Sequence, residues 1–292
     1  MHQVRYICMK KVNTFELARD IMRSLWFVSE PEKLMRVARE FLAKSPIVMD
    51  AASPELMEYS GAKMSSASGD KKSNRKRVMI VPIHGTMTKY DTCVSYGAQT
   101  LAGILESYVD DASVAGVVID IDSGGGSGNA VPPLVAAIKK LQDAGKPVCV
   151  HCDLCGSAAY WVASQCDAIY MDNKTSEVGS IGAYYLFCDD SAQNPITGEK
   201  WISIYAQESE DKNYAYRQAL EGNVKPAQEE LAVHVKMFQD DVMSGRPGIL
   251  KDEKGVLTGK MFITSDAIRL GMADACKSLK ETAEVVMALA GL

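Results

Sequence analysis

Short hydrophobic runs alternate with amphipathic stretches along most of this chain. Runs with the length and β-branched content of buried strands are VMIVPIHG (78–85), VAGVVIDID (114–122), PVCVHCD (147–153), DAIYMD (167–172) and WISIYA (201–206). Helical periodicity falls between or after them, at 97–110, 129–144, 157–166, 225–243, 265–271 and 278–290. Strands that alternate with helices predict parallel strands joined by crossover helices, which is the α/β class.

The N-terminal quarter has a different pattern. Residues 14–44 show helical spacing interrupted near Pro31, which predicts two short helices. Residues 59–77 are polar, serine-rich and basic, a composition typical of a flexible linker. We therefore expect four parts: an N-terminal helical extension (1–58), a polar linker (59–77), a core domain (78–277) and a C-terminal helix (278–292).

Composition narrows the class of protein. The chain has 292 residues, 47% of them hydrophobic and 24% charged, which is ordinary globular composition. A net charge of −5 argues against a general nucleic-acid binder. No apolar run reaches the roughly 18 residues of a membrane span, and the N-terminus lacks the features of a secretory signal. We expect a cytoplasmic protein whose eight cysteines are reduced thiols.

Three glycine- and serine-rich motifs lie where predicted strands end. They are Asp122-Ser-Gly-Gly-Gly-Ser-Gly128, Cys155-Gly-Ser-Ala-Ala-Tyr160 and Val178-Gly-Ser-Ile-Gly182. The first could expose backbone N–H groups to a ligand or could be a tight turn. Ser157 could be a helix cap, or a nucleophile beside free N–H donors. The third reads as a turn when taken alone.

Taken together and in order, these motifs resemble the signal-peptide-peptidase (protease IV) family, and within it the bacteriophage prohead proteases. The matching segments are Ser123–Ser127 (with Gly124 where the family has proline), Gly156–Trp161, Gly179–Gly182 and Phe262–Asp274. The resemblance covers about residues 78–277. It implies a Clp-protease/crotonase-like fold of repeated ββα units.

The resemblance also implies a set of site residues. Ser157 would be the nucleophile, the N–H groups of Gly126 and Ala158 would form the oxyanion hole, and Gly125 and Ser180 would support them. Family members use a lysine as general base, placed after the strand that follows the glycine–serine motif. In this sequence that lysine is Lys212, two residues beyond the aligned position and next to acidic residues. A lysine base must be neutral near pH 7, so burial would have to lower its pKa.

The implied function is that of a serine endopeptidase with a Ser–Lys dyad that cleaves phage scaffold or capsid proteins during prohead maturation. Its implied partners are protein substrates and further copies of itself in a ring, with no nucleic acid. It would need no cofactor and no metal. The implied location is the bacterial host cytoplasm, including the interior of the prohead.

Several alternatives stay open at this stage. A crotonase-type acyl-coenzyme A enzyme would use the glycine-rich N–H groups without Ser157, and an inactive scaffold or assembly subunit would cleave nothing. His151 is a rival general base. A zinc site at Cys149, His151, Cys152 and Cys155 is disfavoured because alternate residues of one strand point to opposite faces.

Overall fold

The computed structural model describes residues 26–28, 56–61, 64–66, 76–92, 95–186 and 205–292. For 26–28 and 64–66 it describes the backbone alone. The strands are β1 (Trp26–Val28), β2 (Met57–Tyr59), β3 (Met64–Ser66), β4 (Arg77–His84), β5 (Val114–Ser123), β6 (Gly125–Ser127), β7 (Val148–Gly156), β8 (Ala168–Met171), β9 (Glu177–Gly179), β10 (Met261–Ile263) and β11 (Ala275–Cys276). The helices are α3 (Ala98–Ser107), η1 (Gly128–Ala130), α4 (Val131–Asp143), α5 (Ala158–Ala163), η2 (Gln207–Ser209), α7 (Tyr214–Leu220), α8 (Lys225–Gly245), α9 (Thr264–Arg269) and α10 (Leu279–Leu289).

Parallel strands form the centre of the main sheet. Among the described residues its order is β10-β9-β7-β5-β4-β2-β3, with β8 pairing β7 and β11 pairing β8. The pairs β4–β5, β5–β7, β7–β8 and β7–β9 are all parallel. Crossover connections containing α3 and α4 join the first three of these strands, so the predicted α/β class is confirmed.

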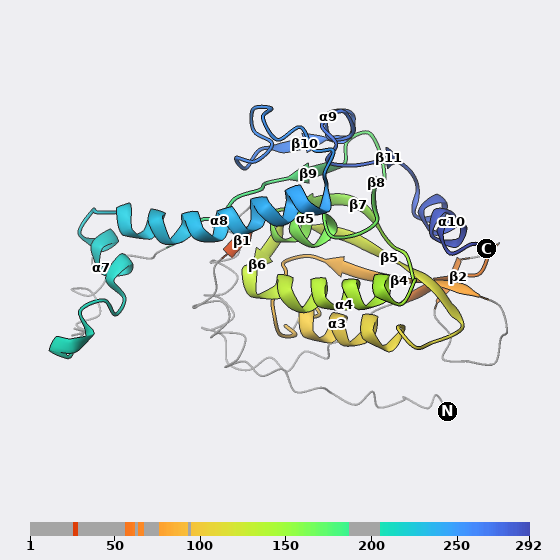
Figure 1. Cartoon of the computed structure of the whole chain (residues 1–292), viewed down its shortest axis with the longest axis horizontal. Coiled ribbons are helices and arrows are strands. Elements are labelled where there is room, and N and C mark those ends of the chain that lie inside the picture. Colours follow the sequence, from red (N-terminus) through yellow and green to blue (C-terminus); the bar gives the residue numbers. More distant parts are fainter. Residues whose placement is uncertain (1–25, 29–55, 62–63, 67–75, 93–94, 187–204) are drawn as a thin grey trace, which may run out of the picture.

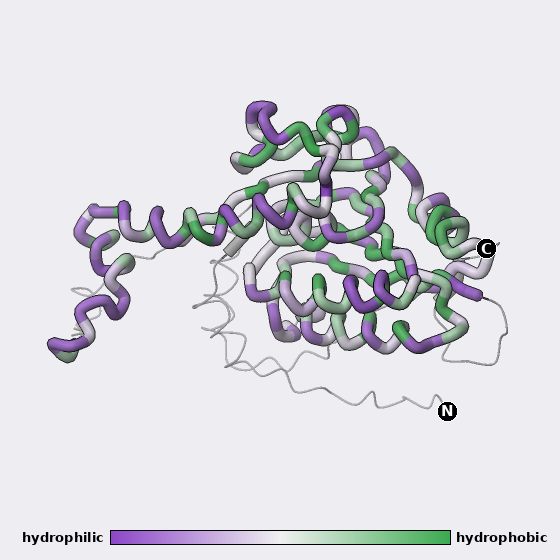
Figure 2. The backbone as a smooth tube through the Cα atoms, viewed as in Figure 1, coloured by the Kyte–Doolittle hydropathy of each residue, from purple (hydrophilic) through white to green (hydrophobic). Residues whose placement is uncertain are grey.

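Each face of this sheet buries its own hydrophobic cluster. On one face, α3 and α4 lie over the sheet (Figure 1), and Leu105, Ile138 and Ile119 belong to one buried cluster. On the other face, Val286 of α10 packs against Val118. Figure 2 shows the resulting concentration of hydrophobic residues in the central strands and in α10. The strands are hydrophobic on both faces because helices cover both faces.

The segment before β4 differs from the linker that the composition predicts. Strands β2 and β3 form an antiparallel pair, and β2 also pairs antiparallel with β4. Tyr59 is buried in the cluster beneath α10, and its hydroxyl donates to Glu284. Thus the folded core includes residues before 78. The two predicted helices of 14–44 lie outside the described residues, except for 26–28, which are extended as β1.

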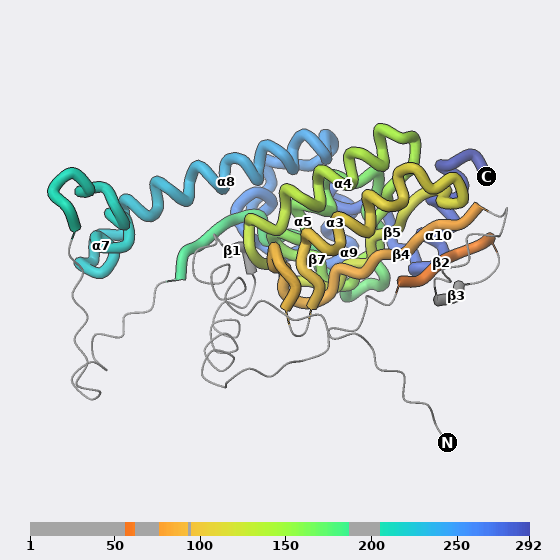
Figure 3. The backbone as a smooth tube through the Cα atoms, turned by 90° about the horizontal axis from the view of Figure 1, so that it is seen from below, coloured from red at the N-terminus to blue at the C-terminus, as the bar shows by residue number. Residues whose placement is uncertain are grey.

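A long helix projects from the body of the protein. The C-terminal half of α8 packs on α5, where the rings of Trp161 and Phe238 stack at 4.6 Å between centroids and Asp241 accepts a hydrogen bond from the Trp161 indole. Figures 1 and 3 both show α8 running outward, with α7 at its outer end. Of the predicted strand 201–206, only Tyr205 and Ala206 are described, and neither is in a strand.

Candidate active site

Ser157 occupies a constrained turn between β7 and α5. Its backbone has φ 55° and ψ −122°, and the residue is 2% exposed. A non-glycine residue in this region costs about 1–3 kcal/mol and persists only where the surrounding fold enforces it. The side chain makes no capping hydrogen bond. The cap interpretation of Ser157 therefore does not describe this structure, which leaves the hydroxyl uncommitted to the helix.

The glycine-rich motif forms the short strand β6 beside this turn. A backbone bridge joins Gly126 to Met87, in which Met87 donates to the Gly125 carbonyl at 3.0 Å and accepts from the Ser127 N–H at 2.9 Å. A Cβ on Gly126 would lie 2.0 Å from the Met87 carbonyl oxygen. Ser123 links β6 to the turn after β4, because its hydroxyl donates to the Gly85 carbonyl and accepts from the Gly125 N–H. The motif thus needs glycine for close backbone approach.

The third motif meets the second directly. Ser157 donates its N–H to the Gly179 carbonyl at 2.8 Å, and Gly156 pairs with Gly179 in the parallel β7–β9 ladder. Ser180 follows at φ 56°, and its N–H bonds the Lys260 carbonyl. A Cβ on Gly179 would lie 2.4 Å from that same carbonyl. The fold therefore brings Ser157 and Ser180 to one place, as the resemblance implies.

Backbone N–H donors lie close to Ser157. Ser123 is paired with Cys155 in the β5–β7 register, and a Cβ on Gly156 would sit 3.3 Å from the Gly124 carbonyl, so β6 runs beside the serine turn. Ala158 is the first residue of α5, a position whose N–H has no partner within a helix. A hydroxyl flanked by backbone donors can attack a carbonyl while the donors stabilise the resulting oxyanion.

Lys212 is far from this cluster within one chain. It is exposed, in the turn between η2 and α7, and its backbone N–H bonds the Ser209 carbonyl. The outer end of α8 at Lys225 is 13 residues from Phe238, which corresponds to about 20 Å of helix, and α7 lies at that outer end (Figure 1). The desolvated cleft that a lysine base requires is therefore not formed around Lys212 by its own chain.

His151 is tied into a separate network on the α10 face of the sheet. Its Nδ1 lies 2.7 Å from Asp120 and its Nε2 lies 3.1 Å from Asp172, so both ring nitrogens face carboxylates. It precedes Ser157 by six residues of mostly extended chain, on the order of 20 Å. Because neither nitrogen is available and the serine is remote, the rival Ser–His arrangement is not supported.

Contacts within this network shift the pKa values of its members. Burial alone would raise the pKa of Asp120, but hydrogen bonds from His151 and His84 outweigh it and lower the pKa to about 2. Burial alone would lower the pKa of His151, but Asp120 and Asp172 outweigh it and raise the pKa above 6.5. The network therefore favours charged histidine between two carboxylates.

This network predicts a pH-dependent stability. The contribution of His151 to the free energy of unfolding is complete below pH 6.5, and it is lost as the pH rises through the raised pKa of His151 in the folded state. The contribution of Asp120, on the order of 2 kcal/mol, is present above pH 3.8 and is lost as the pH falls toward 2. Thermal unfolding of wild type from pH 5 to 9 should show a declining Tm that flattens in His151→Asn. An equally steep decline in the variant would contradict the assignment.

The cysteines of β7 are packed side chains. Cys149, Cys152 and Cys155 are buried free thiols, and burial raises the pKa of Cys149 to about 12 and that of Cys155 well above its usual value. Within the described ranges, no group of three or more His, Cys, Asp or Glu side chains is placed to hold a metal ion. Cys149 and Cys155 are therefore poor thiolate ligands and poor nucleophiles.

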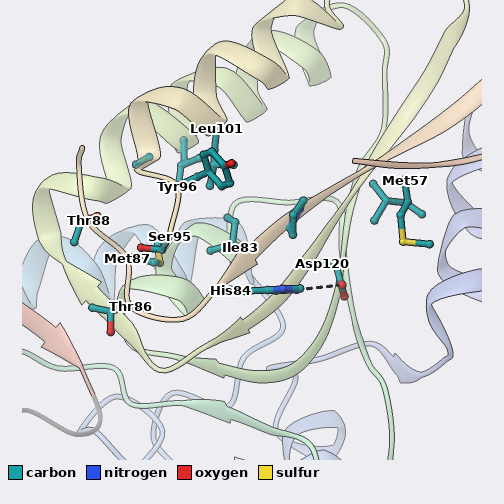
Figure 4. Close-up of a pocket in the computed structure, with 14 residues that line it drawn as sticks. Met57, Ile83, His84, Thr86, Met87, Thr88, Ser95, Tyr96, Leu101 and Asp120 are labelled. Atoms are coloured by element: carbon teal, nitrogen blue, oxygen red, sulfur yellow. Dashed lines mark hydrogen bonds and ion pairs between the residues drawn. The ribbon is translucent and has the colours of Figure 1, made fainter. Parts of the chain in front are cut away.

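A cavity of about 340 Å³ lies at the edge of β4 rather than at Ser157 (Figure 4). Most of its lining is apolar, with His84 and Asp120 paired at one wall and Met87 at another. Its described lining contains no Lys or Arg, and Asp120 contributes a carboxylate. This chemistry does not suit the phosphates of coenzyme A, so the cavity gives no support to the acyl-coenzyme A alternative.

Two contributors to the site were missed by sequence reasoning. Met87, which holds β6 through its backbone, follows a predicted strand end but carries no motif signal. The Lys260 carbonyl holds Ser180, although its own ammonium lies over the Phe262 ring at 5.0 Å rather than toward the serine. Both act through main-chain groups, which residue type does not reveal.

Known proteins resemble this chain over most of its length. Protease 4 of Haemophilus influenzae is 28% identical over 211 residues, covering 70% of this chain and 33% of the relative. Head-tail preconnector protein GP5 of Enterobacteria phage P21 is 25% identical over 233 residues, covering 69% and 44% respectively. The chain thus spans a third to less than half of the length of these curated relatives.

Solved structures and a family profile complete the comparison. A membrane-bound stomatin-specific protease aligns with a TM-score of 0.37 and 16% identity over 69% of this chain and 80% of its own. An enoyl-CoA hydratase from Shewanella pealeana aligns with a TM-score of 0.39 and 8% identity over 74% and 73%. The profile of Peptidase family S49 matches residues 140–292, more than half of the chain, and includes Ser157 and the glycine–serine motif. The chain therefore belongs to peptidase family S49.

Proposed function

We propose that this chain is a serine endopeptidase with Ser157 as its nucleophile. The observation that carries the proposal is the backbone of Ser157, which is held at φ 55° while its hydroxyl makes no capping hydrogen bond. Beside it lies β6, where the Met87 backbone comes so close that Gly126 has no room for a side chain. Such strain at a serine beside N–H donors is typical of a reactive turn. Membership of family S49 supports the same reading.

The proposed reaction uses the described groups in order. A general base takes the proton of the Ser157 hydroxyl as its oxygen attacks the substrate carbonyl. The N–H groups of Gly126 and Ala158 stabilise the oxyanion. Collapse breaks the peptide bond, and the protonated base gives its proton to the leaving amine. Water then hydrolyses the acyl-enzyme by the same route, which restores the serine.

We infer that the base is Lys212 of a neighbouring copy. Lys212 lies just before α7, at the outer end of the arm that α7 and α8 form away from Ser157. Large hydrophobic side chains are exposed along this arm: Tyr214, Tyr216, Leu220, Val224, Val233 and Met237. Exposed apolar residues gathered on one projecting element are typical of an interface with another chain. Burial in such an interface would give Lys212 the desolvated surroundings that a lysine base requires.

Mixing two inactive variants tests this arrangement. Ser157→Ala keeps the lysine and Lys212→Met keeps the serine, so a mixed assembly contains sites with both groups. We expect each variant alone to be inactive and a one-to-one mixture to regain about a quarter of wild-type peptide hydrolysis, because random assembly pairs an intact serine with an intact neighbouring lysine at about one site in four. Lys225→Met, at an exposed lysine of the same arm, should stay active as the matched lysine control. A mixture that stays inactive would contradict a base supplied by a neighbour.

We further propose that the substrates are scaffold or capsid proteins of a phage head. Support comes from the motif resemblance to prohead proteases and from the likeness to a phage head-tail preconnector protein. None of the described helices has the length and apolarity needed to cross a membrane. Proposed partners are thus protein substrates and further copies of the chain, and the proposed location is the bacterial host cytoplasm, including the prohead interior.

Active-site labelling distinguishes the peptidase from its alternatives. A fluorophosphonate probe should modify Ser157, as mapped by mass spectrometry of the labelled peptide, and prior labelling should block hydrolysis of a casein substrate. An acyl-coenzyme A enzyme or an inactive scaffold subunit would leave Ser157 unmodified. Co-expression with candidate scaffold and capsid proteins would then test the substrate class by the appearance of cleaved products.

A further inference from the structure

The short strand β1 lies along the glycine strand of the candidate site. β1 and β6 form a two-stranded antiparallel sheet in which Trp26 faces Ser127, Phe27 faces Gly126 and Val28 faces Gly125. About a hundred residues separate the two strands in sequence. The segment therefore reaches the site through the tertiary fold rather than by local turn formation.

The direction of the backbone groups shows which donors this pairing occupies. The Met87 backbone forms hydrogen bonds with the Gly125 carbonyl and the Ser127 N–H, so these two groups point toward the turn that follows β4. Successive residues of a strand direct their N–H and carbonyl groups to opposite sides. The N–H of Gly126 consequently points to the other side, toward Phe27 of β1. This N–H is the one assigned to the oxyanion hole.

Both edges of β6 are thus occupied by the chain itself. The Met87 bridge takes one edge, and β1 takes the other. An extended peptide that adds to a strand edge uses main-chain hydrogen bonds of the same kind as β1 makes. A peptide substrate whose carbonyl must reach the Gly126 N–H therefore needs the place that β1 holds.

We propose that Trp26–Val28 is an inhibitory strand that occupies the substrate position on β6. This inference rests on the proposed peptidase function and adds its regulation: substrate and the chain's own β1 compete for one edge. When β1 leaves β6, the Gly126 N–H becomes available to substrate, and when β1 pairs again, that N–H is occupied. The partner that displaces it is an extended peptide segment of a protein substrate.

A proline in β1 tests the competition by activity. Phe27→Pro removes the backbone N–H opposite Gly126 and disfavours pairing, whereas Phe27→Leu keeps the N–H and serves as the matched control. We expect fluorophosphonate labelling of Ser157 to become about tenfold faster in the proline variant, the size expected when one or two net hydrogen bonds are lost. The leucine variant should react like wild type. Equal labelling rates in the proline variant and wild type would overturn the inhibitory role.

Amide exchange provides a readout that does not depend on catalysis. In a Ser157→Ala background, the Gly126 amide should exchange slowly with Phe27 present and about tenfold faster with Phe27→Pro, as followed by hydrogen exchange of the peptide containing 124–128. Unchanged exchange would overturn the pairing. If every protein failed to label while exchange still responded to the proline, the peptidase proposal would fail and the strand pairing would stand.

Discussion

Ser157→Ala is expected to abolish peptide hydrolysis and probe labelling, with a loss of about 10⁴-fold or more, because it removes the attacking oxygen. Stability should change by less than about 1 kcal/mol, since the Ser157 side chain caps no backbone group. Ser157→Gly should also be inactive but should raise the Tm, because glycine adopts positive φ without the strain that serine carries.

A second buried serine, at the opposite end of α5, provides the control. Ser164 follows α5, is fully buried and donates to the Trp161 carbonyl at 2.7 Å. Ser164→Ala should lose some stability yet keep its activity. Residual hydrolysis near wild-type level in Ser157→Ala, measured on a fluorogenic peptide with the Tm recorded in parallel, would remove Ser157 from the mechanism.

Gly126→Ala is expected to produce the next largest loss of activity. The new Cβ would lie 2.0 Å from the Met87 carbonyl oxygen, so β6 must move away from the turn that holds it. Displacing one oxyanion donor costs about 10²–10³ in kcat. Binding of substrate should suffer less than turnover, because the donor acts most strongly on the developing oxyanion.

The matched control is a glycine-to-alanine substitution at a position where the new Cβ meets no neighbouring atom. Gly103 lies on the exposed side of α3, and a Cβ there meets no atom within 4 Å. Gly103→Ala should be fully active and more stable by up to about 1 kcal/mol through helix propensity. Normal kcat in Gly126→Ala, with intact fold by circular dichroism, would argue that this N–H does not contact the oxyanion.

The central architecture could be predicted from the sequence because burial leaves a local signature. Runs such as 114–122 are hydrophobic on both faces, and the structure places them at β4, β5, β7 and β8 with helices on either side. The glycine and serine motifs follow strand ends, and parallel strands bring those ends together at one edge. The meeting of Ser157 with Gly179 and Ser180 was therefore predictable, although their chemical roles stay predictions.

Other parts depend on contacts that no local pattern records. β2 is only three residues long and pairs with β4, about twenty residues later in the sequence. The polar composition of 59–77 carries no sign of this pairing and therefore predicted a linker. The exposure of Lys212 follows from the outward course of α8 rather than from its neighbours in sequence. The need for glycine at 126 comes from the Met87 carbonyl, which the turn at Gly85 brings close to β6 in the folded chain.

The anchoring of α8 has a mechanical consequence. Trp161 stacks on Phe238 of α8, and the same residue donates its backbone N–H to the Ser157 carbonyl at 2.9 Å. The long helix and the serine turn therefore share Trp161 as a common anchor. We expect a partner that binds the arm to influence the serine turn through this residue.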